Sequence, residues 1–418
     1  MKFSRIGNKF SSNIGIVELM NELGKALSEN KDMIMMGGGN PSHIPEVQKY
    51  LRQSMQSLLD SDREFETMLG DYDGPKGNLR FRKALAKLLN DSYDWGINEN
   101  NIALTSGSQS AFFSLFNIFG GSDENGKVKK ILFPLTPEYI GYGDSSIEDD
   151  VFTSRKAKIE HIDQHTFKYH VDFDALDIDD SIAAICVSRP TNPTGNVITD
   201  DEIIQLEEIA RKNDIPLIID NAYGAPFPGI IFTDIESRWN DSLIMCLSLS
   251  KLGMPGTRTG IVIANEKVIS TLASMNSVMS LAPGSFGAEL ALDLVESQNI
   301  IKLSQEVIQP YYYEKARRAI KLLHQHLKED ISWHIHKAEG AMFLWLWFEN
   351  LPITSQELYE RLKDKNVLVV SGHHFFPGLD EKDWPHQHEC IRMTYSSEST
   401  QVEAGIKIIA DEINALYS

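Results

Sequence analysis

Cysteine is scarce in this sequence of 418 residues, which contains three cysteines, Cys186, Cys246 and Cys390. So small and odd a number, widely spaced along the chain, excludes the disulfide framework that stabilises many secreted domains. We therefore expect a protein of a reducing compartment, the cytoplasm.

Long apolar runs are also missing. The longest informative run, AMFLWLWF, falls far short of the roughly 18 apolar residues that a membrane-spanning helix requires. The N-terminal stretch MKFSRIGNKFSSNIGIVELMNELGK lacks the continuous apolar segment of a signal peptide. We expect neither a membrane partner nor an export signal.

Basic residues are in deficit, since 40 Lys and Arg stand against 59 Asp and Glu, which gives a formal net charge of −19. Such a charge keeps a protein soluble and opposes binding to the phosphate backbone of nucleic acids. We therefore expect no nucleic-acid partner.

What the chain does contain is short apolar runs that alternate with amphipathic segments. This alternation is typical of an α/β protein with a mostly parallel central sheet between helices. The runs between residues 183 and 264 are apolar on both faces, as strands covered by helices on two sides require. The predicted strands of this sheet are NIALTS, KILFPL, AAICVS, PLIID, LIMCLSLS and GIVIA.

Helical periodicity predicts helices over residues 46–59, 77–89, 108–119, 200–212, 286–297 and 305–327. The C-terminal part differs, because AMFLWLWF, NVLVVSG and CIRMTYS indicate a second, smaller sheet, closed by a helix over residues 400–416. We therefore predict a large domain over residues 46–300 and a small α+β domain built from both chain ends, residues 1–45 and 301–418.

Polar residues directly follow several of the predicted strands. In an open α/β sheet, ligands bind beyond the carboxyl ends of the strands. The stretch TSGSQS passes from strand to helix through Ser106, Gly107 and Ser108, and the N-terminus of a helix suits a phosphate. An ordinary serine cap with a glycine turn explains this stretch equally well.

Three further segments place single polar side chains beside strand ends. PLIIDNAYG ends a strand with Asp220, followed by Tyr223, and SRPTNPTG holds Asn192 between two prolines. Each has a plain structural reading as a helix cap or a rigid turn. Lys251 follows a buried strand with Arg258 nearby. Lysine is seldom buried, and a neighbouring cation would lower its pKa and make it a usable nucleophile.

The joint occurrence of these features, in one order along the chain, favours chemistry over coincidence. A phosphate cradle, a carboxylate at a strand end and a partly desolvated amine are the parts that hold pyridoxal phosphate.

The sequence resembles the fold-type I aminotransferases of class I and II. The resemblance is carried by YDGPKGNLRFRKALA, TSGSQ, LTPEYIGY, SRPTNPTGN, IIDNAYG, SLSKLGMPGTRTG and CIRMTYS, which span Tyr72 to Tyr395 in the order of the family. It implies a large and a small domain, pyridoxal 5'-phosphate as the cofactor, and a homodimer.

The resemblance also implies roles for single residues around the cofactor ring. Lys251 matches the lysine to which the cofactor is attached, and Asp220 the acid that keeps the pyridine nitrogen protonated. Tyr223 and Asn192 match side chains that hydrogen-bond the ring oxygen. Tyr139 matches the aromatic residue that stacks on the ring.

Further matches concern the phosphate and the substrate. Residues implied to surround the phosphate are Gly107, Ser108, Gln109, Ser248, Ser250 and Arg258, and which of the two serines is closer stays open. Tyr72 matches a tyrosine that reaches the cofactor phosphate of the partner subunit. Arg392 matches the arginine that grips the substrate α-carboxylate, with help from Asn192 and the backbone of Gly39.

Two departures from the family bear on the substrate. The interval from Lys251 to Arg258 is one residue shorter than in the aspartate branch, and no motif indicates the second arginine of dicarboxylate enzymes. The missing arginine weakens the assignment of aspartate or glutamate as substrate, and the resemblance implies ping-pong transfer of the amino group between a small aliphatic amino acid (valine, alanine) and a 2-oxo acid (pyruvate, 2-oxoisovalerate).

Two alternatives remain beside this prediction. The same scaffold could serve a carbon–sulfur β-lyase, or a regulator that binds pyridoxal phosphate, although about 35 residues before GGGNP leave little room for a DNA-binding domain. The stretch HQHEC offers His386, His388 and Cys390 at alternate positions, but a tetrahedral zinc site needs a further ligand, and we predict no metal.

Overall fold

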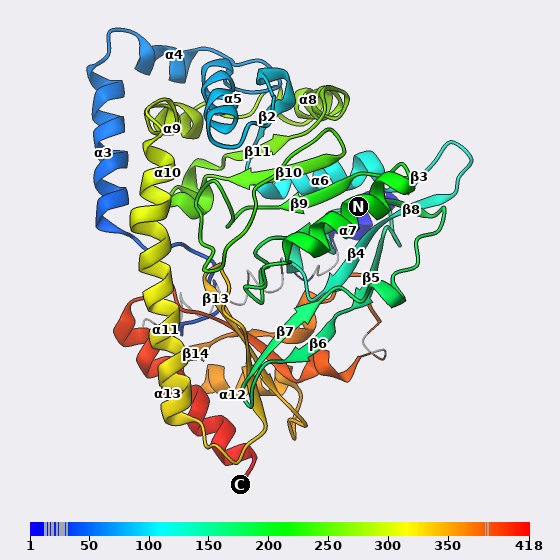
Figure 1. Ribbon diagram of the computed structural model, residues 1–418, viewed down its shortest axis with the longest axis vertical. Coiled ribbons are helices and arrows are strands. Elements are labelled where there is room, and N and C mark those ends of the chain that lie inside the picture. The colour runs from blue at the N-terminus through cyan, green and yellow to red at the C-terminus, as the bar shows by residue number, and fades with distance from the viewer. Residues whose placement is uncertain are drawn as a thin grey trace.

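A computed structural model of the chain describes residues 1–11, 15, 17, 21, 24, 30, 32–380, 382 and 384–418. Helices cover a large sheet in the upper part of Figure 1, and a smaller sheet lies below it. None of the described helices is long and apolar enough to cross a membrane.

The larger sheet has eight strands in the order β2-β11-β10-β9-β8-β4-β3, with β5 paired to β4. Strands β5, β4, β8, β9 and β10 are mutually parallel, whereas β11 runs antiparallel to β10 and β2. This confirms the predicted α/β class, and each of the six predicted strands lies in this sheet. The bounds are β2 Ile102–Thr105, β3 Gly121–Ser122, β4 Val128–Thr136, β5 Phe152–Lys156, β8 Ile182–Ser188, β9 Leu217–Asp220, β10 Leu243–Ser248 and β11 Gly260–Ile263.

Both faces of this sheet are buried, which explains its apolar strands. Successive side chains of a strand point to opposite faces. On β8, Ala184 and Cys186 join a cluster with α6 (Ser108–Phe119) and α8 (Glu266–Ser280), whereas Ile185 and Val187 join the main core on the other face.

The predicted helices are present, with small changes at their ends. The segment predicted over residues 305–327 begins with a π-helical turn, Ser304–Ile308, before α11. The helices that were not predicted are α1, α4, α8, α10 and α12. The remaining bounds are α1 Arg5–Ser11, α3 Pro45–Asp60, α4 Glu64–Gly70, α5 Leu79–Tyr93, α7 Asp200–Lys212, α9 Phe286–Glu296, α10 Asn299–Leu303, α11 Gln309–His326, α12 Ser355–Asp364 and α13 Ser399–Leu416.

The smaller sheet has six strands in the order β15-β16-β13-β12-β7-β6. Strands β13, β15 and β16 were predicted, whereas β12 was not, and β6 and β7 come from an excursion that follows β5. By its hydrogen bonds this excursion belongs to the smaller sheet, because β7 pairs in parallel with β12. The domain boundaries given above remain a prediction. The bounds are β6 Lys158–His161, β7 Thr166–His170, β12 Trp333–His336, β13 Phe343–Phe348, β15 Val370–Ser371 and β16 Cys390–Thr394.

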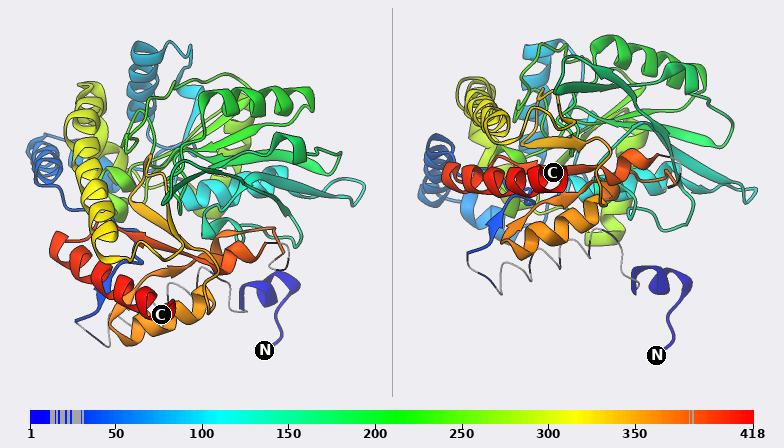
Figure 2. Two further views of the ribbon diagram at one scale, coloured as in Figure 1. Left: turned by 60° about the horizontal axis from the view of Figure 1, so that its bottom comes forward. Right: turned by 90° about the horizontal axis from the view of Figure 1, so that it is seen from below.

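The two ends of the chain meet beside the smaller sheet. Strand β1 (Ile34–Met35) pairs in parallel with β14 (Val367–Leu368), and Thr394 donates its N–H to the carbonyl of Met36. Figures 1 and 2 show α11 running from the helices of the larger sheet to α13, against which it packs. This arrangement brings the segment after β1 to the edge where the strands of the larger sheet end.

Candidate active site

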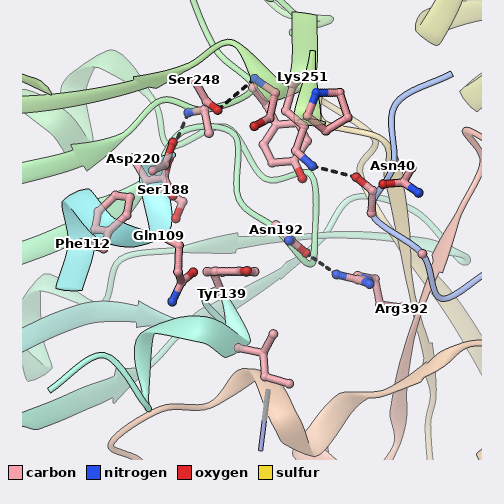
Figure 3. Close-up of a pocket in the computed structure, with 18 of the residues that line it drawn as sticks. Asn40, Gln109, Phe112, Tyr139, Ser188, Asn192, Asp220, Ser248, Lys251 and Arg392 are labelled. Atoms are coloured by element: carbon pink, nitrogen blue, oxygen red, sulfur yellow. Dashed lines mark hydrogen bonds between the residues drawn. The ribbon is translucent and has the colours of Figure 1, made fainter. Parts of the chain in front are cut away.

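A cavity of about 480 Å³ opens at the carboxyl edge of the larger sheet (Figure 3). Strands β8, β9 and β10 end there side by side, with Ser188 and Cys246 both opposite Asp220 in register. Most of the predicted site residues line it: Gly39, Ser108, Gln109, Tyr139, Asn192, Asp220, Tyr223, Ser248, Ser250, Lys251, Arg258 and Arg392.

Lys251 enters the cavity from a short 3₁₀ turn, Ser250–Leu252, that follows β10. Its Nζ donates to the carbonyl oxygen of Gly39 at 2.7 Å, and lies 5.3 Å from the centre of the Tyr223 ring. Burial, helped by the charges of Arg392 and Arg258, lowers the pKa of Lys251 to about 8. A fraction of this amine is therefore uncharged near neutral pH, the form that attacks a carbonyl.

Asp220 is the last residue of β9, and its carboxylate faces the cavity. Oδ2 accepts a hydrogen bond from the hydroxyl of Tyr142 at 2.5 Å, and Oδ1 accepts one from the N–H of Ala222 at 2.9 Å. Burial raises the pKa of Asp220, while these two hydrogen bonds act in the opposite direction. A buried carboxylate in this position can pair with a protonated ring nitrogen.

The start of α6 and Arg258 form an anion-binding corner. Gly107 precedes α6 with φ of +85°, which favours glycine, and a Cβ there would lie 2.1 Å from Nη2 of Arg258 and would displace that guanidinium. No described side chain caps the first N–H groups of α6. These N–H groups and the guanidinium suit a phosphate. Gly107 therefore belongs to this corner although it does not line the cavity.

The two serines after β10 differ in their contacts. Arg258 Nη1 donates to Oγ of Ser250 at 3.4 Å, whereas Oγ of Ser248 accepts the N–H of Ser250 at 3.1 Å. Gln109 turns away from this corner, since its Nε2 donates to Gly141 O and Ser145 Oγ, both at 3.0 Å. Ser250 thus has its hydroxyl nearer to the anion-binding guanidinium.

Arg392, on β16, lies at the opposite end of the cavity. Nη1 donates to Oδ1 of Asn192 and Nη2 to the carbonyl of Gly37, both at 2.7 Å. The guanidinium carbon lies 4.2 Å from the ring centre of Phe343 and 5.2 Å from that of Phe375. Burial lowers the pKa of Arg392 to about 10, so the side chain stays charged at neutral pH. A planar cation held in this way suits a carboxylate.

Two aromatic side chains complete the walls. Tyr223 is buried and meets Phe343 edge to face, with ring centres 6.0 Å apart, and burial raises the pKa of its phenol. It therefore remains a hydrogen-bond donor at neutral pH. Tyr139 presents its ring to the cavity and contacts Tyr142 edge to face.

Tyr72 is not brought into this cavity. It precedes α5, and its side chain is 85% exposed. The predicted role of Tyr72 concerns a partner subunit, so its position outside the cavity of its own chain leaves that role a prediction.

Sequence reasoning missed several residues at the site. Phe112, Ser188 and Asn40 line the cavity, and Glu138 and Tyr142 lie directly behind it. The motif LTPEYIGY contained both Glu138 and Tyr142, but drew attention only to Tyr139. A glutamate inside an otherwise apolar motif was the available signal.

Comparison with known proteins extends over the whole chain. The family profile "Aminotransferase class I and II" matches residues 31–409. The chain is 49% identical over 418 residues to valine–pyruvate aminotransferase of Escherichia coli strain K12, covering 100% of this chain and 99% of the relative.

Solved structures give the same picture. The crystal structure of valine–pyruvate aminotransferase from Salmonella typhimurium LT2 superposes with a TM-score of 0.88 at 49% identity, covering 96% of this chain and 99% of the other. A multiple substrate aminotransferase from Thermococcus profundus superposes with a TM-score of 0.80 at 21% identity, covering 99% and 98%, a likeness of fold alone.

Proposed function

The chain belongs to the class I and II aminotransferases, as its motifs predicted, and from this premise we propose that it exchanges amino groups between small aliphatic amino acids, valine or alanine, and the 2-oxo acids pyruvate or 2-oxoisovalerate. The name and the 49% identity of the Escherichia coli relative support this substrate pair. Two half-reactions share one site, so the kinetics are ping-pong.

Aminotransferases of this family use pyridoxal 5'-phosphate, and the cavity fits that group. The corner formed by Gly107 and Arg258 would hold the phosphate, Asp220 would pair with a protonated ring nitrogen, and Lys251 lines the same cavity. When bound, the cofactor supplies an aldehyde carbon that takes up the amino group and a ring that withdraws electrons from the substrate α-carbon.

The proton transfer at the substrate α-carbon is assigned to Lys251. Its amine, with a pKa of about 8, can accept a proton at Nζ and return it within the cavity. A base positioned in this way contributes roughly 10²–10⁴ in rate. Asp220 supports the step because its charge stabilises a proton on the ring nitrogen.

Substrate orientation is assigned to Arg392. Its guanidinium is fixed by Asn192, by the carbonyl of Gly37 and by two aromatic rings. A bidentate grip on the α-carboxylate from this position turns the α C–H bond toward Lys251.

The charged residues of the cavity wall support a small aliphatic substrate. Among the described lining residues the cations are Lys251, Arg258 and Arg392, and each has a task at the amine, the phosphate or the α-carboxylate. A side-chain carboxylate would find no further cation among the lining residues that the structure describes. Apolar lining residues such as Met35, Ile140 and Pro190 favour an aliphatic side chain.

We also propose a homodimer in which Tyr72 reaches the partner's site. Tyr72, Val278 and Leu281 are exposed, and Ser285 donates to Asp73 at 2.6 Å, which links the segment after α8 to the neighbour of Tyr72. Exposed apolar side chains of this kind support association. A cytoplasmic location is supported by the three cysteines, which are free and buried.

The experiment that tests the substrate pair incubates the purified protein with L-valine and pyruvate and measures all products. We expect 2-oxoisovalerate and alanine in equal amounts, and at least tenfold lower kcat/KM with L-aspartate as donor. Lys251→Ala serves as the inactive control. Release of ammonia or sulfide without an oxo-acid acceptor would instead favour a lyase.

A further inference from the structure

A second carboxyl group, that of Glu138, lies behind Asp220 and is used by no step described so far. Glu138 is fully buried, with 0% of its surface exposed. Its Oε1 accepts the N–H of Ser188 at 2.9 Å and its Oε2 accepts the hydroxyl of Ser188 at 2.5 Å. The N–H of Glu138 donates to the carbonyl of Phe375 at 2.8 Å, which fixes the residue on its other side.

Two hydroxyl groups connect Glu138 to Asp220. Oγ of Ser188 lies 3.2 Å from the phenol oxygen of Tyr142, and that phenol lies 2.5 Å from Oδ2 of Asp220. The four side chains therefore form one line of three oxygen-to-oxygen contacts, with a carboxyl group at each end.

The number of hydrogens in this line depends on the charge of its ends. Ser188 and Tyr142 bring one hydrogen each, so two ionised carboxylates would leave one of the three contacts without a hydrogen. One additional proton fills all three contacts. If that proton lies on Glu138, each hydroxyl donates toward Asp220, and Asp220 is ionised; if it lies on Asp220, each donates toward Glu138.

The surroundings favour a single proton on the pair. No described Lys, Arg or His forms an ion pair with Glu138, and burial raises its pKa to about 8, with the charge of Asp220 acting in the same direction. Burial raises the pKa of Asp220 as well, although Lys251 opposes this shift. The other titratable groups close to the line, the phenol of Tyr139 and the thiol of Cys186, are uncharged at neutral pH.

We propose that Glu138 is a positioning residue that shares one proton with Asp220 through Ser188 and Tyr142. When a protonated ring nitrogen faces Asp220, the shared proton resides on Glu138 and Asp220 is ionised. When the cavity holds no ring, the proton passes back: one hydrogen shifts in each contact, from Glu138 to Ser188, from Ser188 to Tyr142 and from Tyr142 to Asp220. Net charge is unchanged, and no unpaired carboxylate is left in the cavity.

Infrared difference spectroscopy of the full chain tests the shared proton. Wild-type protein should show, at neutral pH, the C=O band of a protonated carboxyl group that both Glu138→Gln and Asp220→Asn remove. The new side-chain amide of each variant keeps the hydrogen bond from the backbone N–H and donates its own N–H to the neighbouring hydroxyl. This N–H takes the place of the shared proton, so no protonated carboxyl group is needed. Glu207→Gln, at a buried glutamate bonded to Asn240 away from the cavity, should leave the band unchanged.

A band that survives Asp220→Asn would overturn the proposal, because Glu138 would then be neutral on its own account. A band that survives Glu138→Gln would overturn it equally. The measurement uses no amino-acid substrate, so its failure is separate from failure of the proposed aminotransferase specificity. The catalytic consequence of the line does rest on that proposed function.

Cofactor affinity gives a second readout. Glu138→Gln should bind pyridoxal phosphate within about threefold of wild type, whereas Glu138→Leu, which leaves the Ser188 hydroxyl without its acceptor, should bind about tenfold more weakly. Tyr142→Phe cuts the line, so the difference between the Gln and Leu variants should vanish in that background. Equal weakening by Gln and Leu in the wild-type background would contradict the proposal.

Discussion

At the scale of single residues, the two arginines of the cavity have different surroundings and different tasks. Arg258 lies beside a helix start and a serine hydroxyl, whereas Arg392 contacts two aromatic rings and donates to an amide oxygen and a backbone carbonyl. The guanidinium of Arg392 therefore makes both aromatic contacts and hydrogen bonds. An ammonium group cannot reproduce this arrangement.

We therefore expect Arg392→Lys to lower kcat/KM for L-valine by at least 10²-fold, because the variant loses the bidentate grip on the α-carboxylate. Cofactor affinity should change little, since Arg392 lies at the other end of the cavity from Gly107 and Arg258. Arg361→Lys, at a half-exposed arginine that pairs with the buried Glu412, is the matched control and should retain wild-type kinetics.

The residues of the cavity could be predicted from sequence to different degrees. Lys251, Asp220 and Arg392 stand in motifs or directly after apolar runs, so local sequence indicated them, and the structure brings them to one cavity. Glu138 and Tyr142 could not be assigned in this way. Their importance arises from hydrogen bonds to Ser188 and Asp220, which come from strands that follow much later in the chain.

At the scale of elements, helix α7 illustrates how one buried carboxylate can join two segments. Glu202 closes a capping box with Thr199 and also accepts hydrogen bonds from the N–H of Val171 and the ring of His170 at the end of β7. Burial acts to raise the pKa of Glu202, but these hydrogen bonds outweigh it and the pKa falls to about 2. The ionised form of Glu202 therefore stabilises the fold.

This stabilisation should depend on pH in a defined window. It is fully present above the unfolded value of about 4.3 and is lost as pH falls through about 2, with a total of roughly 3 kcal/mol. Glu202→Gln should therefore lower the melting temperature at pH 6, and the difference from wild type should shrink between pH 4.5 and 3. Glu208→Gln, on the exposed side of the same helix, should show no such dependence.

The stabilisation that His170 contributes depends on pH in the opposite sense to that of Glu202. Its hydrogen bond with Glu202 raises its pKa, so its share of the stabilisation is present below about pH 6.5 and is lost as pH rises through the folded value. A Glu202→Gln difference that grew between pH 4.5 and 3 would contradict the assignment to Glu202, whereas a difference that did not grow as pH falls through the folded pKa of His170 would contradict the assignment to His170.

Elements with strong local signals were predictable, and those that depend on distant partners were not. The strands of the larger sheet are apolar on both faces, and their positions followed from the sequence. Strands β6 and β7 are rich in polar residues. Their place in a sheet depends on the pairing of β7 with β12, which lies about 170 positions later in the chain. No local pattern assigns them to the smaller sheet.

At the scale of the whole molecule, a buried ion pair ties the excursion to both sheets. Lys168 on β7 pairs with Glu339, and their side chains are 6% and 5% exposed. Nζ of Lys168 also donates to Oδ1 of Asn196 at 3.0 Å and to the carbonyl of Val197 at 2.9 Å. Three segments therefore meet at the ammonium group of Lys168: strand β7, the loop after β8 and the segment before β13.

Removal of one partner should destabilise the molecule strongly. Glu339→Gln leaves the ammonium of Lys168 buried without its counter-charge, and we expect a loss of about 3 kcal/mol, measured as a lower melting temperature. The double variant Lys168→Met with Glu339→Leu should be more stable than Glu339→Gln alone. A double variant as unstable as the single one would show that packing, and not charge, dominates here.

The contact between the first and last segments of the chain also joins parts of the cavity that are synthesised at different times. Arg392 lies on β16, which pairs with β13, and donates to the carbonyl of Gly37, whereas Asp220 ends β9 and Lys251 follows β10 of the larger sheet. On the ribosome, the part of the cavity built by β9 and β10 therefore leaves the exit tunnel first. A nascent chain has no means to seat a substrate carboxylate until its final strand has been synthesised.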